Sequence, residues 1–149
     1  MGQKVNPIAL RMGIHHDFKS VGYYSKKNYA ATVLQDIKIR EMLFEKLRSA
    51  SIGDAQILRT LNGIKITIHV VRPGIVIGRG GQGLEELKKQ IIALMQKTSK
   101  ENVNTKIDLK VEPIKDPNLN AYLVATNVAD QLVRRMPHRR VMKQLSERV

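Results

Sequence analysis

The pattern of apolar and polar positions predicts a long helix followed by a β-hairpin. Apolar side chains recur at helical spacing over residues 28–48, at Val33, Ile37, Phe44 and Leu47. Asn28 precedes them and is suited to cap that helix. Residues 57–61 form a short strand-like run, and Asn62-Gly63 is the dipeptide typical of a type I′ turn. We therefore expect two antiparallel strands joined by a tight turn.

The second strand of this hairpin alternates between apolar and polar residues. Its apolar face is formed by Ile64, Ile66, Ile68 and Val70. Its polar face carries Lys65, Thr67 and His69. A strand with this period buries one face and leaves the other for solvent or a partner. Residues 106–112 alternate in the same way and predict a third strand.

The remaining apolar positions predict helices. One stripe at helical spacing comprises Leu84, Leu87, Ile91, Leu94 and Met95. Another helix is expected over residues 120–135, supported by Val124, Val128 and Leu132. Pro137 disfavours helical geometry at the preceding residue, so the last helix is expected to be separate, with Pro137 in its first turn. Residues 1–27 show no sustained period and predict an irregular basic arm.

A glycine-rich stretch lies between the hairpin and the second long helix. Gly78-Arg79-Gly80-Gly81 has the GXXG pattern of a KH domain, whose loop clamps a nucleic-acid backbone. Gly78, Gly80 and Gly83 also spell GxGxxG, the dinucleotide fingerprint. A Rossmann sheet needs several parallel strands, whereas the strand before this loop belongs to an antiparallel hairpin. The nucleic-acid interpretation is therefore favoured over a cofactor site or a simple tight turn.

The composition points to a polyanionic partner. Lys and Arg number 26 against 13 for Asp and Glu, which gives a net charge of +13 and a pI near 10.2. Such an excess favours nucleic acid first and an anionic membrane surface second. The chain has no cysteine, no apolar run long enough to span a membrane and no signal-like N-terminus, so a cytosolic location is expected.

Catalytic and metal-binding patterns are poor. His15, His16, His69 and His138 are scattered without carboxylates at ligand spacing. No nucleophile and base stand in a recognisable arrangement. We expect no enzymatic activity, no cofactor, no metal, no small-molecule substrate and no membrane partner.

Two groups of cations are candidates for contact with phosphates. Arg79 supplies the charge of the glycine loop, and Lys88 and Lys89 extend it one turn further. The second group lies near the end of the chain and comprises Arg134, Arg135, Arg139, Arg140, Lys143 and Arg148. In the last helix Arg139, Arg140 and Lys143 fall on one side, while Val141, Leu145 and Val149 fall on another. This helix suits RNA better than lipid, because it lacks Trp and Phe anchors.

Three segments together resemble one family. They are residues 1–14, beginning MGQKVNP, residues 72–78, RPGIVIG, and the basic positions of residues 131–143. The chain resembles the bacterial-type small-subunit ribosomal protein S-three family over nearly its whole length. The resemblance implies an α+β fold: a type II KH domain in the order α-β-β-α-α-β, with a three-stranded mixed sheet and helices on one face. It further implies an arm over 1–27, the KH domain over 28–118 and extra helices over 119–149.

The resemblance also implies a function. A member of this family is a structural constituent of the small ribosomal subunit that binds ribosomal RNA in the head, contributes to the mRNA entry channel and contacts head proteins ten and fourteen. Residues 78–81 would form the KH loop, and Arg139, Arg140 and Lys143 would contact incoming mRNA. Lys4 and Arg11 of the arm are further candidates for contact with RNA. The location would be a cytoplasmic ribosome, with an organellar ribosome as an open alternative.

Two features depart from the family pattern. Gly80 stands where the family usually has a second Lys or Arg, so the loop carries one cation instead of two. The chain ends at Val149, where the family continues into a second α/β domain. A free-standing KH-type RNA chaperone or assembly factor is the first alternative function, and a dinucleotide-binding enzyme is the second.

Overall fold

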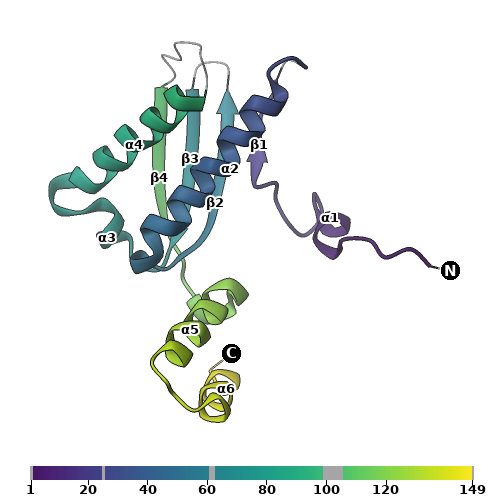
Figure 1. Ribbon diagram of the computed structural model, residues 1–149, viewed down its shortest axis with the longest axis vertical. Helices are drawn as coiled ribbons and strands as arrows, with labels where there is room; N and C mark the ends of the chain where they lie inside the picture. The colour runs from purple at the N-terminus through teal and green to yellow at the C-terminus, as the bar shows by residue number, and fades with distance from the viewer. Residues whose placement is uncertain (1, 25, 61–62, 99–105, 149) are drawn as a thin grey trace.

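A four-stranded mixed sheet forms the centre of the protein (Figure 1). The structure is a computed structural model that describes residues 2–24, 26–60, 63–98 and 106–148. The strands are β1 (Ser20–Val21), β2 (Ile52–Thr60), β3 (Gly63–Val70) and β4 (Lys106–Pro113), in the spatial order β1-β2-β3-β4. β2 and β3 form the expected antiparallel hairpin, while β1 is parallel to β2 and β4 is parallel to β3.

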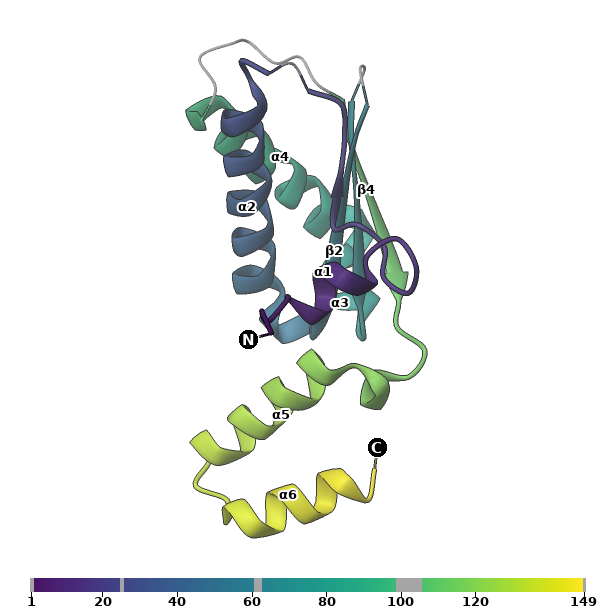
Figure 2. The same cartoon turned by 90° about the vertical axis from the view of Figure 1, so that its right-hand side faces the viewer.

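Two helices cover one face of this sheet. They are α2 (Tyr29–Lys46) and α4 (Gln82–Thr98), which lie side by side on the same side of the strands (Figure 2). The helices are also linked to each other, because Lys46 Nζ donates a hydrogen bond to Gln90 Oε1. The predicted α+β architecture with helices on one face is therefore confirmed.

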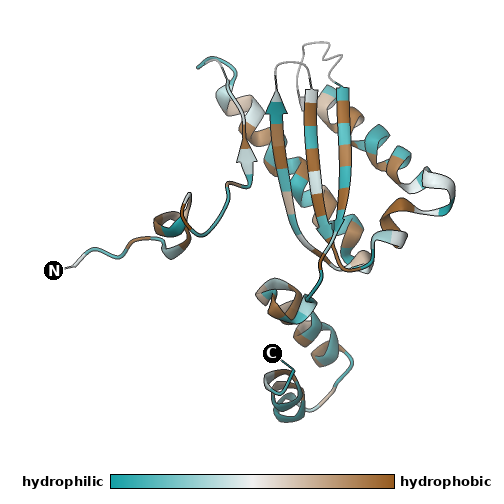
Figure 3. Cartoon of the chain, turned by 180° about the vertical axis from the view of Figure 1, so that it is seen from behind, coloured by the Kyte–Doolittle hydropathy of each residue, from teal (hydrophilic) through white to brown (hydrophobic). Residues whose placement is uncertain are grey.

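The core lies between the helices and the sheet. β3 contributes the alternating residues that the sequence predicts, Ile64, Ile66, Ile68 and Val70. The helices add Ile39 and Leu43 from α2 and Leu87, Ile91 and Met95 from α4. Lys65, Thr67 and His69 lie on the opposite face of the sheet, which no helix of the described residues covers (Figure 3).

The arm is more ordered than its sequence predicts. It contains a short helix, α1 (Pro7–Arg11), whose N-cap Asn6 accepts hydrogen bonds from the backbone N–H groups of Ile8 and Ala9. It also contains β1, which makes the sheet four-stranded instead of three-stranded. The backbone N–H of Ile57 donates to the carbonyl oxygen of Lys19, 2.9 Å away, at the start of this pairing. A strand of two residues is too short to show a period, so the sequence pattern missed it.

One predicted boundary was wrong, and one predicted cap is correct in position but makes no capping bond. β2 begins at Ile52, not at residue 57, because a bulge between Ile52 and Asp54 interrupts its pattern. Asn28 occupies the N-cap position of α2, but its side chain makes no capping hydrogen bond. The type I′ turn at Asn62-Gly63 lies partly outside the described residues and stays a prediction.

The buried face of α2 also differs from the predicted stripe. Ile37 is 41% exposed, whereas Gln35 and Asp36 are buried. Asp36 Oδ1 forms an ion pair with Arg59 of β2, at 2.6 Å from Arg59 NH2. This polar link between the helix and the sheet turns Ile37 toward solvent.

The C-terminal residues form a helical hairpin below the sheet. η3 (Pro117–Leu119) leads into α5 (Ala121–Val133), and α6 (His138–Ser146) packs back against α5. Asn120 caps α5 by accepting hydrogen bonds from the backbone N–H groups of Tyr122 and Leu123. The rings of Phe44 in α2 and Tyr122 in α5 meet edge to face with centroids 5.3 Å apart, which joins the hairpin to α2. The last helix is separate from α5, as predicted. It begins at His138, so Pro137 is its N-cap residue and does not lie in its first turn.

Candidate nucleic-acid interface

The GXXG loop joins two helices. α3 (Pro73–Ile77) follows β3 directly, and η2 (Arg79–Gly81) leads into α4. The loop is thus preceded by a helix, whereas a dinucleotide fingerprint connects a strand directly to a helix. This helix–loop–helix arrangement is the one that the KH interpretation requires, and it removes the structural basis of the cofactor interpretation.

Two glycines around the loop are required by packing. A Cβ atom on Gly83 would lie 2.5 Å from the carbonyl oxygen of Val76 and 3.1 Å from that of Ile77. A Cβ atom on Gly78 would lie 3.1 Å from the backbone nitrogen of Gly83, and Gly78 has a φ of 70°. These residues allow the end of α3 to touch the start of α4, so their first role is structural.

The other two glycines leave the loop open. Gly80 has a φ of 62° and Gly81 a φ of 82°, and a Cβ atom on either would meet nothing within 4 Å. Positive φ values are readily adopted by glycine. The backbone at these two positions is accessible, so a phosphodiester oxygen that approaches Gly80 or Gly81 meets no side chain there. The N-terminus of α4, which begins at Gln82, adds a partial positive charge beside them.

Arg79 is the charged group of the loop. Its side chain is exposed and makes no hydrogen bond or ion pair with the residues that the structure describes. Lys89 is exposed on α4 and Lys88 is half-buried. Glu85 and Glu86 in the first turns of α4 are exposed as well. Their negative charges reduce the attraction of this region for a phosphate. Arg79 is therefore the main electrostatic contact that this loop offers to a phosphate.

The C-terminal cations lie on the outer surface of the helical hairpin. Arg139, Arg140 and Lys143 are exposed on α6, while Val141 and Leu145 of the same helix are buried. The predicted division of this helix is confirmed at those five positions, and Val149 lies outside the described residues. α5 covers the apolar side of α6, which leaves its basic side free to meet a partner.

Arg134 and Arg135 form the turn between α5 and α6. The N–H of Met136 donates to the carbonyl of Gln131 at 3.2 Å, and the N–H of Arg135 donates to that of Leu132 at 2.9 Å. This is a Schellman motif, in which glycine usually takes the left-handed position. Arg135 takes it here with a φ of 60°. An arginine there costs strain of about 1–2 kcal/mol.

The structure does not gather all candidate cations at one place. The loop between α3 and α4 lies at one side of the sheet, the arm leaves from the opposite side and α6 lies below the sheet (Figure 1). In the arm, Arg11 NH1 donates to the carbonyl of Pro7, and Lys4 is exposed without a partner among the described residues. The loop, the α6 surface and the arm are three separate basic regions.

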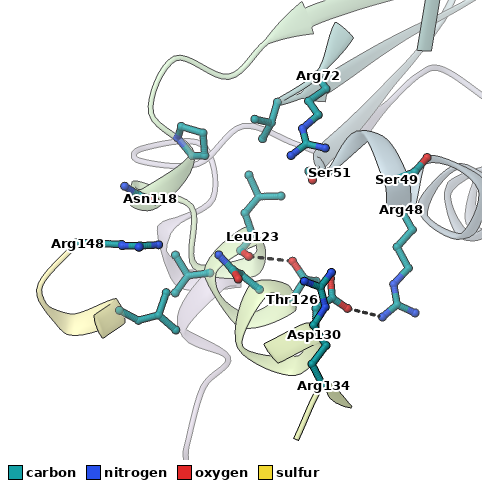
Figure 4. Close-up of a pocket in the computed structure, with 15 residues that line it drawn as sticks. Arg48, Ser49, Ser51, Arg72, Asn118, Leu123, Thr126, Asp130, Arg134 and Arg148 are labelled. Atoms are coloured by element: carbon teal, nitrogen blue, oxygen red, sulfur yellow. Dashed lines mark hydrogen bonds and ion pairs between the residues drawn. The ribbon is translucent and has the colours of Figure 1, made fainter. Parts of the chain in front are cut away.

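Sequence reasoning missed two arginines that long-range packing brings to the hairpin. Arg48 of η1 (Leu47–Ala50) and Arg72 at the N-cap of α3 line the same cavity as Arg134 and Arg148 (Figure 4). Arg48 NH2 pairs with Asp130 Oδ1 at 3.0 Å. No sequence signal would have found this group, because its members are up to 100 residues apart in the chain (148 − 48).

The described part of the chain contains no group of three His, Asp or Glu side chains placed to hold a metal ion. None of its helices is long and apolar enough to cross a membrane.

Comparisons with known proteins agree with this geometry. Residues 38–118 match the KH domain family. The chain is 48% identical over 149 residues to small ribosomal subunit protein uS3 of Pelotomaculum thermopropionicum, covering 99% of this chain and 61% of that relative. It is 46% identical over 143 residues to uS3 of Hahella chejuensis, covering 96% of this chain and 60% of the relative. It is 40% identical over 148 residues to uS3 of Lactobacillus helveticus, covering 99% and 62%.

The chain therefore spans about 60% of the length of the curated relatives that it matches. The match includes the arm, the loop and the helical hairpin, because it extends over nearly all of this chain. The chain belongs to the KH domain family and, within it, to the family of small ribosomal subunit protein uS3.

Proposed function

We propose that this protein is an RNA-binding structural constituent of the small ribosomal subunit. The observation that carries the proposal is the open backbone at Gly80 and Gly81 beside the unpaired Arg79, in a chain whose relatives are named as ribosomal proteins. Backbone N–H groups and one guanidinium hold a phosphodiester without reading its base. Residues 28–118 would form the RNA-binding unit of this assembly, with residues 1–27 as a basic arm and 119–149 as accessory helices.

The finer assignment follows the family. In this assignment the KH part of the chain, residues 28–118, binds ribosomal RNA in the head of the subunit, next to head proteins ten and fourteen. Arg139, Arg140 and Lys143 contact mRNA at the entry channel as electrostatic clamps. The role is non-enzymatic, and the protein is bound to cytoplasmic ribosomes. A free-standing assembly factor is not favoured, because the relatives that match the arm, the loop and the hairpin together carry ribosomal names.

Co-sedimentation with small ribosomal subunits tests the proposal. We expect the full chain to sediment with small subunits, and the double variant Arg79→Asp/Gly80→Asp to bind rRNA fragments at least tenfold more weakly at low salt, because two acids replace one cation at the phosphate. The matched control is Lys38→Asp/Ala93→Asp, which makes the same charge change at exposed positions of α2 and α4. If the wild-type chain stays in the supernatant, or the loop variant binds like the control, the proposal is wrong.

A further inference from the structure

A second basic site lies where the helical hairpin meets the KH part of the chain (Figure 4). It is a cavity of about 410 Å³, within the usual size range of ligand sites. Four arginines line it, and each comes from a different segment: Arg48 from η1, Arg72 from just before α3, Arg134 from just after α5 and Arg148 from just after α6. The cavity is distinct from the GXXG loop and from the basic side of α6.

The charge of this cavity is not balanced by the protein. Asp130 is the one acid that lines it, and Arg48 already pairs with that carboxylate at 3.0 Å. The four arginines and one aspartate leave a formal charge of 4 − 1 = +3. Arg72, Arg134 and Arg148 make no side-chain hydrogen bond or ion pair within the described ranges. Guanidinium groups that line one cavity repel each other unless an anion lies between them.

The arginines reach the cavity from opposite sides. The backbone N–H of Arg72 donates to the carbonyl of Ala50, which fixes Arg72 beside Ser51 on the KH wall. Figure 4 shows Arg72 extending from this wall, while Arg148 enters from the hairpin side. The polar residues Ser49, Ser51, Asn118 and Asn127 also line the space. The walls thus offer hydrogen-bond donors from several directions.

One residue of the cavity wall has a strained backbone. Among the described residues, Ser51 and Arg135 are the two non-glycine residues with a positive φ, at 56° and 60°. Ser51 lines the cavity, and Arg135 directly follows the lining residue Arg134. The Schellman motif at the end of α5 accounts for Arg135, so Ser51 is the strained residue that belongs to the cavity wall. Strained residues of this kind cluster at ligand sites.

We propose that this cavity binds a phosphodiester group of RNA, held between the KH part and the helical hairpin. A tetrahedral phosphate presents oxygens in several directions, so it can accept hydrogen bonds from arginines on opposite walls. A carboxylate presents two oxygens in one plane and is satisfied by a single guanidinium fork. The proposal rests on the proposed RNA binding and adds a separate contact to it. Because Arg72 and Arg148 come from the two walls, the bound phosphate also fixes the hairpin against the KH part.

The test uses the full chain, a labelled short single-stranded RNA and fluorescence anisotropy over a salt series. The double variant Arg72→Gln/Arg148→Gln should lose about tenfold in affinity, the usual effect of removing charge-assisted bonds. The slope of log K against log salt should fall by about 0.7, the value for one phosphate of a single strand. The matched control Lys38→Gln/Lys65→Gln removes the same charge from exposed positions outside the cavity and should change affinity less than twofold.

A second variant distinguishes loss of the guanidinium groups from loss of folding. Arg72→Lys/Arg148→Lys keeps the charge but removes the planar forks, so its affinity should fall by less than that of the glutamine variant with little change in salt slope. Arginine Nε–H signals of the wild-type protein should shift on titration with inorganic phosphate, and RNA should abolish that response.

The possible results separate this proposal from the proposed function. If RNA binding depends on Arg79 while both cavity variants match the control, the cavity proposal alone is overturned. The same holds if phosphate shifts the arginine signals but RNA does not compete, which would mean an adventitious ion only. Preferential binding of an oligoglutamate peptide in the cavity would assign it to an acidic protein partner and overturn the RNA proposal. If the wild-type chain binds no RNA, both proposals fail.

Discussion

Gly83 lies so close to Val76 that a Cβ atom at position 83 would be 2.5 Å from the Val76 carbonyl oxygen. The obstructing atom belongs to the backbone, so a side-chain rotation cannot relieve the contact. The approach of α3 to α4, and with it the geometry of the GXXG loop, therefore depends on the absence of a side chain at this residue.

Replacing Gly83 with Ala should destabilise the protein by about 1–3 kcal/mol, the usual cost of overpacking. It should also weaken RNA binding, because α3 and α4 must separate at the loop. Gly74→Ala is the matched control, since a Cβ atom there meets nothing within 4 Å. That control should leave stability unchanged or raise it slightly, as alanine favours a helix. Urea denaturation measures the stability of the two variants. Equal midpoints would show that a Cβ atom at position 83 does not overpack the contact between α3 and α4.

Asp36 and Arg59 should behave as a buried ion pair. Their side chains are 5% and 12% exposed, and Arg59 also donates to Gln35 Oε1 at 3.2 Å. Asp36→Ala leaves the guanidinium of Arg59 buried without its carboxylate, so we expect a loss of about 3–5 kcal/mol in the free energy of unfolding. The double change Asp36→Leu/Arg59→Met should cost much less, because both buried charges are removed together.

An exposed ion pair in the same protein provides the comparison. Arg48 and Asp130 are 3.0 Å apart, with side chains 72% and 54% exposed. Asp130→Ala should change the unfolding free energy by no more than about 1 kcal/mol. Thermal or urea unfolding of the two alanine variants measures the difference. A cost for Asp36→Ala no larger than that for Asp130→Ala would show that burial does not set the strength of the first pair.

The elements with a clear period could be predicted from the sequence. The apolar face of β3 and the stripe of α4 were predicted correctly, because each element buries one continuous face against the same core. The KH loop was also predictable, since its glycines and Arg79 are adjacent in the chain. In these cases local sequence and tertiary packing favour the same structure.

Features that depend on contacts between distant segments could not be predicted. The face of α2 was assigned wrongly because Arg59, on a different element, draws Asp36 into the interior. β1 is defined by its pairing with β2 and has no pattern of its own. The arginine cavity combines four segments, and only the position of α5 under the sheet brings Arg48 and Arg72 toward Arg134.

The basic side of α6 should contribute to RNA binding without contributing to stability. The triple variant Arg139→Ala/Arg140→Ala/Lys143→Ala removes exposed side chains, so the unfolding free energy should stay within about 0.5 kcal/mol. The salt slope for single-stranded RNA should fall by about 2, which is three phosphates at roughly 0.7 each. Anisotropy titrations over a salt series measure this slope. An unaltered slope would show that this side of α6 does not contact phosphates.

A lysine at position 80 should add a phosphate contact between the loop and RNA. A Cβ atom on Gly80 meets nothing within 4 Å, so a lysine side chain has room beside Arg79. Gly80 has a φ of 62° and a ψ of 18°, and a left-handed residue other than glycine costs about 1–2 kcal/mol. We expect Gly80→Lys to lose that stability while its salt slope for single-stranded RNA rises by about 0.7, one added phosphate contact.

Gly80→Ala separates the backbone cost from the effect of charge. It should show the same loss of stability as Gly80→Lys, because both residues carry a Cβ atom in the left-handed conformation, but its salt slope should equal that of the wild-type protein. If the lysine variant shows the wild-type slope as well, the side chain at position 80 does not reach the RNA backbone. The wild-type contact would then depend on Arg79 and the backbone N–H groups, and a second cation at position 80 would add nothing to it.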